Sequence, residues 1–165
     1  MDLLSAKTVK ELLAKHQARP SKIMGQNFLI DKNTLDKIIK AADLKLQDTV
    51  LEIGPGMGLL TQALAKTAKR VVAIEKDPVM IEILKETLRD YNNVEIIHGD
   101  ALTQNYSLPT TNYKLVANIP YYLTSPLIRK FLEGKIQPKT IVLMVQKEVA
   151  QRICAIPPSM SLLAV

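Results

Sequence analysis

The chain has 165 residues, 47% of them hydrophobic and 23% charged, a composition typical of a folded domain rather than of a disordered segment. One cysteine, Cys154, excludes an intrachain disulfide, and the longest apolar run, Ile141 to Val145, is too short to cross a bilayer. Its 22 basic and 16 acidic residues give a net charge of +6, which favours a polyanionic partner. Because no signal-peptide pattern opens the chain, we expect a soluble, cytoplasmic protein with no membrane partner.

The first 24 residues carry half of the net charge, with five basic residues against two acidic ones. Apolar residues at near-helical spacing predict a helix over residues 2–17, and Arg19-Pro20 predicts a break after it. We expect residues 1–24 to form a basic N-terminal helix and arm, and residues 25–165 to form one larger domain. Charge alone does not separate a solvated helix from one that contacts a polyanion.

From residue 31 onward, helix-like and strand-like segments alternate. Asp31 is the predicted N-cap of the first of these helices, and Pro78 lies in the first turn of another. The predicted strands cover residues 49–53, 70–74, 94–97, 113–117 and 140–145, and the predicted helices cover 32–42, 59–68, 78–90, 126–132 and 147–153. This alternation predicts an α/β protein with a doubly wound, mostly parallel sheet and helices on both faces.

A glycine-rich segment follows the first predicted strand, where an open α/β sheet binds its ligands. In Gly54-Pro55-Gly56-Met57-Gly58 the glycines allow a tight turn and a close approach of the backbone to a ligand. The spacing GxGxG is shorter than the dinucleotide pattern GxGxxG. By itself, this segment is equally typical of a plain tight turn.

Two acidic residues end the next two predicted strands. Glu75 lies 21 residues after Gly54, where a carboxylate can accept hydrogen bonds from both hydroxyls of a ribose. Asp100 ends the third strand, where a carboxylate can accept from the exocyclic amine of adenine. Together with the glycine segment they indicate a nucleoside cofactor. Because no site for a pyrophosphate is evident, S-adenosylmethionine is favoured over NAD.

The fourth predicted strand ends in Asn118-Ile119-Pro120-Tyr121. The asparagine carbonyl and a neighbouring backbone carbonyl can accept both hydrogens of an aromatic amine, which is a poor nucleophile while its lone pair is delocalised into the ring. Two fixed acceptors favour a pyramidal nitrogen and free that lone pair. Pro120 makes the turn rigid, and the ring of Tyr121 can stack on a base.

Several segments together resemble the adenine-N6 dimethyltransferases of ribosomal RNA. Asn118-Ile119-Pro120-Tyr121 is similar to their NIPY/NLPY motif, and Glu52-Ile53-Gly54-Pro55-Gly56-Met57-Gly58 to their S-adenosylmethionine loop. Gly25-Gln26-Asn27-Phe28-Leu29 resembles the segment before their methyltransferase core. Residues 145–152 and 160–165 resemble the small-subunit branch, which dimethylates two adjacent adenosines near the 3′ end of the rRNA, rather than the large-subunit branch that confers macrolide resistance.

The resemblance implies a Rossmann-like, class I methyltransferase fold and assigns roles to individual residues. The catalytic set that it implies is Asn118, Ile119 and Pro120 through their carbonyls and Tyr121 through stacking. The cofactor set that it implies is Asn27, Leu29, Gly54, Gly56, Glu75, Asp100, Ala101 and Asn118. The family continues with further strands and a small helical C-terminal domain, so we expect this sheet to be incomplete at its C-terminal end.

Two other functions stay open from the sequence. One is a large-subunit resistance methylase, and the other is a ribosome-assembly or RNA-binding factor without catalysis, because a fold does not guarantee an activity. The two histidines, His16 and His98, lie 82 residues apart with no acidic cluster between them, so we expect no metal site. The expected partner is small-subunit rRNA in a pre-ribosomal particle, bound by a monomer.

Overall fold

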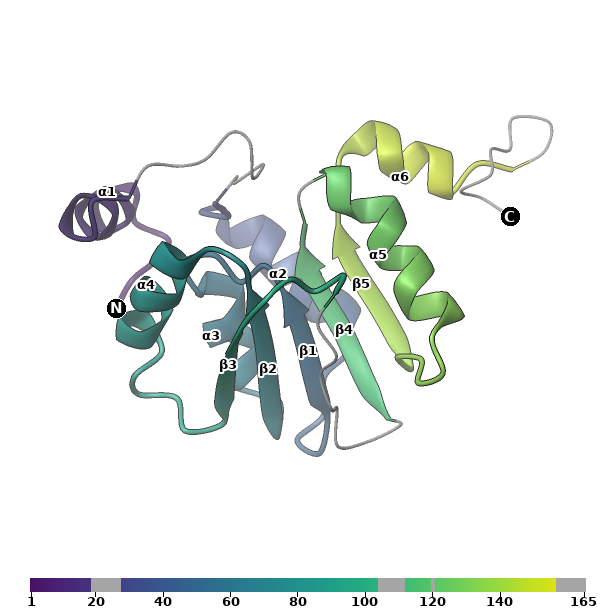
Figure 1. The fold of residues 1–165 in the computed structure, drawn as a ribbon, viewed down its shortest axis with the longest axis horizontal. Coiled ribbons are helices and arrows are strands. Elements are labelled where there is room, and N and C mark those ends of the chain that lie inside the picture. Colours follow the sequence, from purple (N-terminus) through teal and green to yellow (C-terminus); the bar gives the residue numbers. More distant parts are fainter. Residues whose placement is uncertain (19–27, 104–111, 120, 157–165) are drawn as a thin grey trace.

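Five parallel strands form one sheet in the computed structural model, which describes residues 1–18, 28–103, 112–119 and 121–156 (Figure 1). Their order across the sheet is β3-β2-β1-β4-β5, so the first strand lies at the centre. The strands are β1 (Thr49–Ile53), β2 (Arg70–Glu75), β3 (Val94–His98), β4 (Tyr113–Asn118) and β5 (Thr140–Met144). This arrangement confirms the predicted α/β class and parallel sheet.

Helices cover both faces of this sheet. One face carries α2 (Lys32–Ala42), α3 (Leu59–Ala65) and α4 (Pro78–Thr87), and the other carries α5 (Tyr121–Glu133), as Figure 1 shows for α2, α3 and α5. The remaining helices are α1 (Ala6–Lys15) and α6 (Lys147–Ile153). All five residues of β1 are buried between the layers, as expected for a central parallel strand.

Local signals set most helix starts. The Asp31 carboxylate accepts from Thr34 N–H at 2.7 Å, which confirms the predicted cap of α2, and Asp77 caps α4 in the same manner with Pro78 in the first turn. The prediction for α5 is wrong at its start, because the helix begins at Tyr121 and Pro126 lies inside it. Thr124 and Leu127 are fully buried, and this packing overrides the local preference of proline for a first turn.

A buried lysine joins β4 to the end of α2. Lys114 is 8% exposed, and its ammonium donates to the carbonyls of Ala42 at 2.9 Å and Asp43 at 2.6 Å. It also pairs with Asp48 Oδ2 at 2.9 Å. Burial opposes the ionisation of Asp48, but the bonds from Lys114 and from Lys45 N–H hold its pKa below the usual value. Lys114 therefore satisfies the carbonyls that the end of α2 leaves unpaired.

We predict that Lys114→Met lowers the free energy of unfolding by about 3 kcal/mol, because three acceptors lose a buried cationic donor. Urea denaturation followed by circular dichroism measures the change. Lys69→Met is the matched control, since the Lys69 side chain is exposed while its backbone N–H donates to the carbonyl of Asp48, the partner of Lys114. Its effect should stay below about 0.5 kcal/mol. Equal stabilities for the two variants would contradict this role of Lys114.

A carboxyl group also lies inside the central strand. Glu52 is 1% exposed, and burial raises its pKa to about 8, with the charge of Glu75 adding to the shift. The hydroxyl of Thr61 lies close enough to act against that shift, yet Glu52 Oε2 and Thr61 Oγ1 both lack a hydrogen-bond partner among the described residues. A neutral acid is the form that such a site favours near neutral pH.

This burial makes folding stability depend on pH. The folded pKa of Glu52 is raised above that of the unfolded chain, so the folded state holds a proton that the unfolded state has lost. The free energy of unfolding should therefore fall between about pH 4.5 and about pH 8, by as much as roughly 5 kcal/mol. In Glu52→Gln this slope should flatten, as chemical denaturation at a series of pH values can measure. An identical slope in both proteins would show that Glu52 does not carry it.

Candidate active site

The carboxyl ends of the parallel strands meet around a cavity of about 250 Å³. Its wall contains the glycine segment after β1, the end of β2, the turn after β3 and the ends of β4 and β5. The predicted residues in this wall are Leu29, Gly54, Gly56, Glu75, Asp100, Ala101, Asn118 and Ile119. Residues that are far apart in the sequence are thus brought to one site, at the edge of the sheet where a ligand was expected.

Two predicted site residues and the side chain of a third lie outside the described part of the chain. Asn27 and Pro120 lie outside the described residues, as do the predicted motif residues 160–165. The backbone of Tyr121 begins α5, but its side chain lies outside the described part of the chain.

The glycine segment adopts a conformation that other residues strain to reach. Gly54, Gly56 and Gly58 have φ values of +66°, +58° and +92°. At Gly58 a Cβ would also lie 3.1 Å from both Leu84 and Thr87, so α4 packs directly on the turn. The hydroxyl of Thr87 donates to the Met57 carbonyl at 2.9 Å and holds the segment in place. The segment is therefore a fixed, tight turn in the cavity wall, as the sequence predicted.

Glu75 ties the end of β2 to the glycine segment. Its Oε2 accepts from Gly56 N–H at 3.1 Å, and its Oε1 accepts from the N–H groups of Lys76 at 2.8 Å and Asp77 at 2.9 Å. Burial raises the pKa of Glu75, while these three backbone donors act in the opposite direction. The carboxylate is held rigidly at the cavity wall, where its remaining lone pairs can accept from a ligand.

Asp100 lies in the turn after β3. Its Oδ1 accepts from Leu102 N–H at 2.9 Å, and its Oδ2 accepts from Lys76 Nζ at 2.8 Å. The bond from Lys76, followed by that from Leu102 N–H, holds the pKa of Asp100 below its usual value. The same turn is joined to α5, because Lys130 Nζ donates to the carbonyls of Ala101 and Leu102. Asp100 is therefore an ionised acceptor at neutral pH.

Asn118 and Ile119 mark the other side of the cavity. Asn118 pairs in register with Met144 of β5, and Ile119 N–H donates to the Met144 carbonyl at 3.4 Å. Val145 and Gln146, which follow β5, also line the wall. The end of β4 is thus held against the end of β5, with Asn118 in the cavity wall. A ligand near Asn118 would lie close to the glycine segment, because β4 pairs with β1 in the register that aligns Glu52 with Val116.

Several residues of the cavity wall were not predicted from the sequence. Leu3 and Val9 line the cavity from the N-terminal part of the chain, and Glu52 lines it from β1. A charged residue inside an otherwise apolar strand was a visible signal for Glu52. The helix α1 is anchored to α4 by Glu86, which pairs with Lys15 at 2.8 Å and with His16 at 3.0 Å. The local sequence of α1 does not indicate that its end contacts Glu86 of α4.

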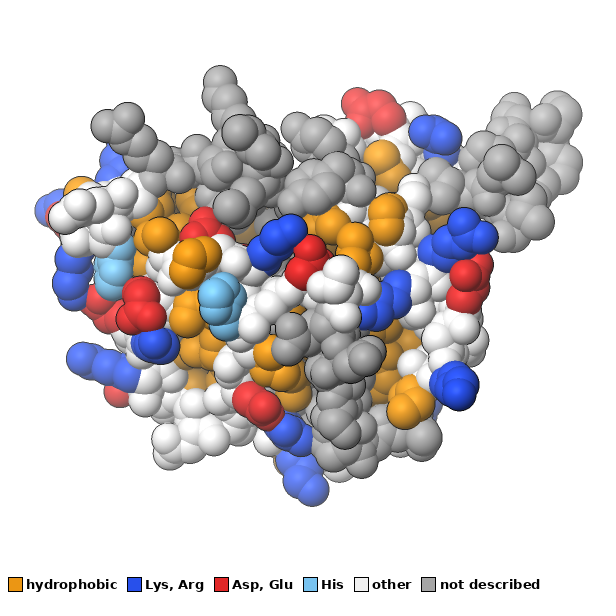
Figure 2. Space-filling model, viewed as in Figure 1, with side chains coloured by type: hydrophobic (Ala, Val, Ile, Leu, Met, Phe, Trp, Pro, Cys, Tyr) orange, Lys and Arg blue, Asp and Glu red, His pale blue; other side chains and the backbone are white. Residues whose placement is uncertain are grey.

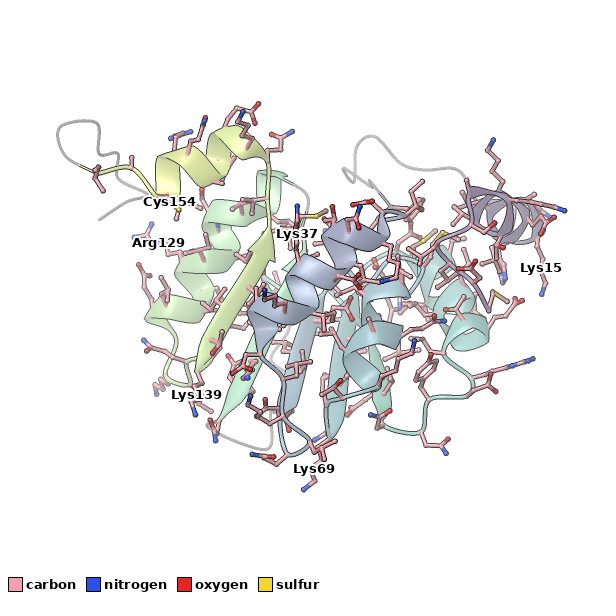
Figure 3. The ribbon with its side chains drawn as sticks, turned by 180° about the vertical axis from the view of Figure 1, so that it is seen from behind. Lys15, Lys37, Lys69, Arg129, Lys139 and Cys154 are labelled. Atoms are coloured by element: carbon pink, nitrogen blue, oxygen red, sulfur yellow. The ribbon has the colours of Figure 1, made fainter. Side chains whose placement is uncertain are left out.

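Among the described residues, basic side chains do not gather at the cavity, whose wall contains only Lys76 of this kind. On the face in Figure 2, lysine and arginine side chains alternate with acidic ones. Figure 3 shows Lys69 and Lys139 at the amino ends of the strands, opposite the cavity, and Lys37 on α2. The structure does not single out an RNA-binding face among the described residues.

The described residues contain neither a metal cluster nor a membrane-spanning helix. No group of three or more His, Cys, Asp and Glu side chains is placed to hold a metal ion there. None of the described helices has the length and apolar character that crossing a membrane requires.

Known proteins are similar to this chain in sequence and in fold. The profile of the family described as "Ribosomal RNA adenine dimethylase" matches residues 16–163. "Ribosomal RNA small subunit methyltransferase A" of Alkaliphilus oremlandii is 46% identical over 164 residues, which cover 95% of this chain and 57% of that protein. The chain thus spans little more than half the length of this relative.

Two solved structures are also similar. A dimethyladenosine transferase from Plasmodium falciparum superposes with a TM-score of 0.72 at 39% identity, covering 84% of this chain and 50% of that one. The 23S rRNA methyltransferase ErmE superposes with a TM-score of 0.70 at 36% identity, covering 76% and 50%. The profile match over most of the chain, together with these relatives, shows that the chain belongs to the ribosomal RNA adenine dimethylase family.

Proposed function

We propose that residues 25–165 form the S-adenosylmethionine-binding part of an enzyme that methylates adenine N6 in small-subunit rRNA. The observation that carries this proposal is the convergence of Glu75, Asp100 and Asn118 on one cavity beside a glycine turn. Glu75 is suited to the ribose of the cofactor and Asp100 to the exocyclic amine of its adenine. Asn118 is suited to the amine that receives the methyl group.

The cofactor would lie along the strand ends. Glu75 would accept from the ribose hydroxyls, since its carboxylate is buried, rigid and directed to the cavity. Asp100 would accept from the adenine amine, and Gly54 would approach the methionine part. Asn27 and Leu29 would close over the cofactor, and Gly56 and Ala101 would make further contacts. No metal ion takes part in this arrangement.

Methyl transfer would occur beside Asn118. Its side-chain carbonyl and the backbone carbonyls of Ile119 and Pro120 would accept the hydrogens of adenine N6, and Tyr121 would stack on the base. The N6 lone pair forms the new N–C bond as the bond from the methyl carbon to the sulfonium sulfur breaks. The alkylated nitrogen is acidic and loses its proton to water, so the site needs no strong base.

The target is proposed as two adjacent adenosines near the 3′ end of small-subunit rRNA, in a pre-ribosomal particle in the cytoplasm. The supporting observation is the higher identity to a small-subunit methyltransferase, 46%, than to the solved 23S enzyme, 36%. A large-subunit methylase is the second candidate because the 23S enzyme shares the fold. A non-catalytic assembly factor would bind the particle without transfer. We propose a monomer as the binding species.

We predict that Glu75→Ala weakens binding of S-adenosylhomocysteine by about 10- to 100-fold, because two hydrogen bonds to a carboxylate are lost. Isothermal titration calorimetry measures the affinity, and circular dichroism checks that the fold persists. Glu82→Ala is the matched control, since Glu82 is exposed on α4 and should leave the affinity unchanged. An unaltered affinity in Glu75→Ala would remove the ribose assignment.

We predict that Asn118→Ala reduces methyl transfer by at least about 1000-fold while cofactor affinity changes only a few-fold, because the amide acts on the target amine. Labelled S-adenosylmethionine and small ribosomal subunits that lack the modification give the readout. The chain is tested alone and joined to the C-terminal part of the Alkaliphilus oremlandii relative.

Mapping the label distinguishes the candidate functions. Label on adjacent adenosines near the 3′ end supports the small-subunit target, whereas transfer only to large-subunit rRNA supports the second candidate. Cofactor binding without transfer in either form of the wild-type chain would favour the assembly factor. Normal turnover by Asn118→Ala would exclude the catalytic role of that residue.

A further inference from the structure

Both oxygens of Asp100 already accept hydrogen bonds within the protein. Oδ1 accepts from Leu102 N–H at 2.9 Å, a backbone contact inside its own turn. Oδ2 accepts from the ammonium of Lys76 at 2.8 Å, and Lys76 comes from the segment after β2. Lys76 and Asp100 both line the cavity. The oxygen that faces Lys76 is therefore engaged by a side chain rather than by fixed backbone.

An adenine amine and a lysine ammonium would approach this oxygen from the same cavity, so they compete for space beside it even though the oxygen has a second lone pair. Both groups are donors, and the ammonium has no acceptor with which to bind the amine in return. Of the two hydrogen bonds to the Asp100 carboxylate, the one from Lys76 is also easier to break than the one from Leu102 N–H. The side chain of Lys76 is 65% exposed and that of Asp100 is 28% exposed, and exposed ion pairs contribute little free energy and are screened by salt.

We propose that Lys76 holds the adenine acceptor of Asp100 when the cofactor is absent, and that the adenine amine displaces its ammonium on binding. This inference rests on the proposed function, because it takes Asp100 as the acceptor for adenine. Lys76 is then a residue that occupies Asp100 in the absence of the cofactor and lowers cofactor affinity. Because it competes only for the amine, its effect is confined to ligands that carry this group.

Other contacts hold the turn that carries Asp100, so the Lys76 ammonium can be displaced without loss of the turn. The Oδ1 bond to Leu102 N–H does not involve Lys76, and Lys130 binds the carbonyls of Ala101 and Leu102 from α5. Lys130 also attracts the Asp100 carboxylate electrostatically. The carboxylate therefore keeps its place and its charge when the Lys76 ammonium leaves.

The test compares two lysine variants and two ligands by isothermal titration calorimetry. Lys76→Met removes the competing ammonium, and Lys85→Met is the matched control, because Lys85 has a similar exposure, 61%, and pairs with Glu82 on α4. The ligands are S-adenosylhomocysteine and its analogue in which hydrogen replaces the adenine amino group. The analogue separates competition for the amine from general packing of methionine against the purine ring.

We expect Lys76→Met to bind S-adenosylhomocysteine about two- to fivefold more tightly than the wild type, with no change for the analogue. Lys85→Met should match the wild type with both ligands. Raising the salt concentration should narrow the difference between wild type and Lys76→Met, because salt weakens the competing ion pair. Weaker or unchanged binding in Lys76→Met, or an equal gain for both ligands, would overturn the inference.

Failure of the proposed function has a different signature. If the wild type does not bind S-adenosylhomocysteine, or binds it without dependence on Glu75, the cofactor site itself is wrong. If binding depends on Glu75 but not on Lys76, the cofactor site stands and only the competition is excluded.

Discussion

The parallel pairing of β1 with β2 on one side and β4 on the other is the constraint on which the whole site depends. The register that sets Ile53 opposite Ile74 brings the glycine turn beside Glu75, and the Gly56–Glu75 hydrogen bond then fixes both. The pairing of β1 with β4 places Asn118 at the same edge of the sheet. A slip of one residue in either pair would move the side chains of a strand to the opposite layer of the core and shift its end at the cavity, so the hydrophobic core and the site geometry are specified together.

Two acids lie at this site in surroundings that oppose their charge. Glu75 offsets its burial with three backbone donors, whereas Glu52 has an oxygen without a partner among the described residues. The apolar layers on both sides of β1 stabilise the strand enough to retain these groups. Polar groups that weaken a fold are commonly found where a ligand binds, and the cavity of this protein follows that rule.

Much of the site could be predicted because strand ends are local features of a sequence. An apolar run followed by glycines or by an acid identifies Gly54, Glu75 and Asp100 without knowledge of the strand order, since all parallel strands end at the same edge. The pairing of Lys76 with Asp100 and the contact of α1 with the cavity were not predictable, because each joins segments through long-range packing. The start of α5 was misplaced for the same reason, as buried Leu127 outweighs the local signal of Pro126.

The attachment of α1 to α4 has a consequence for how tightly the cavity holds a bound molecule. Leu3 and Val9 form part of the cavity wall, while Lys15 and His16 fasten the far end of the helix to Glu86. A ligand that contacts Leu3 and Val9 would stabilise the docked helix, and by reciprocity docking of the helix would raise the affinity for that ligand by the same factor. Occupancy of the cavity is then linked to an ion pair between α1 and α4 that lies outside it.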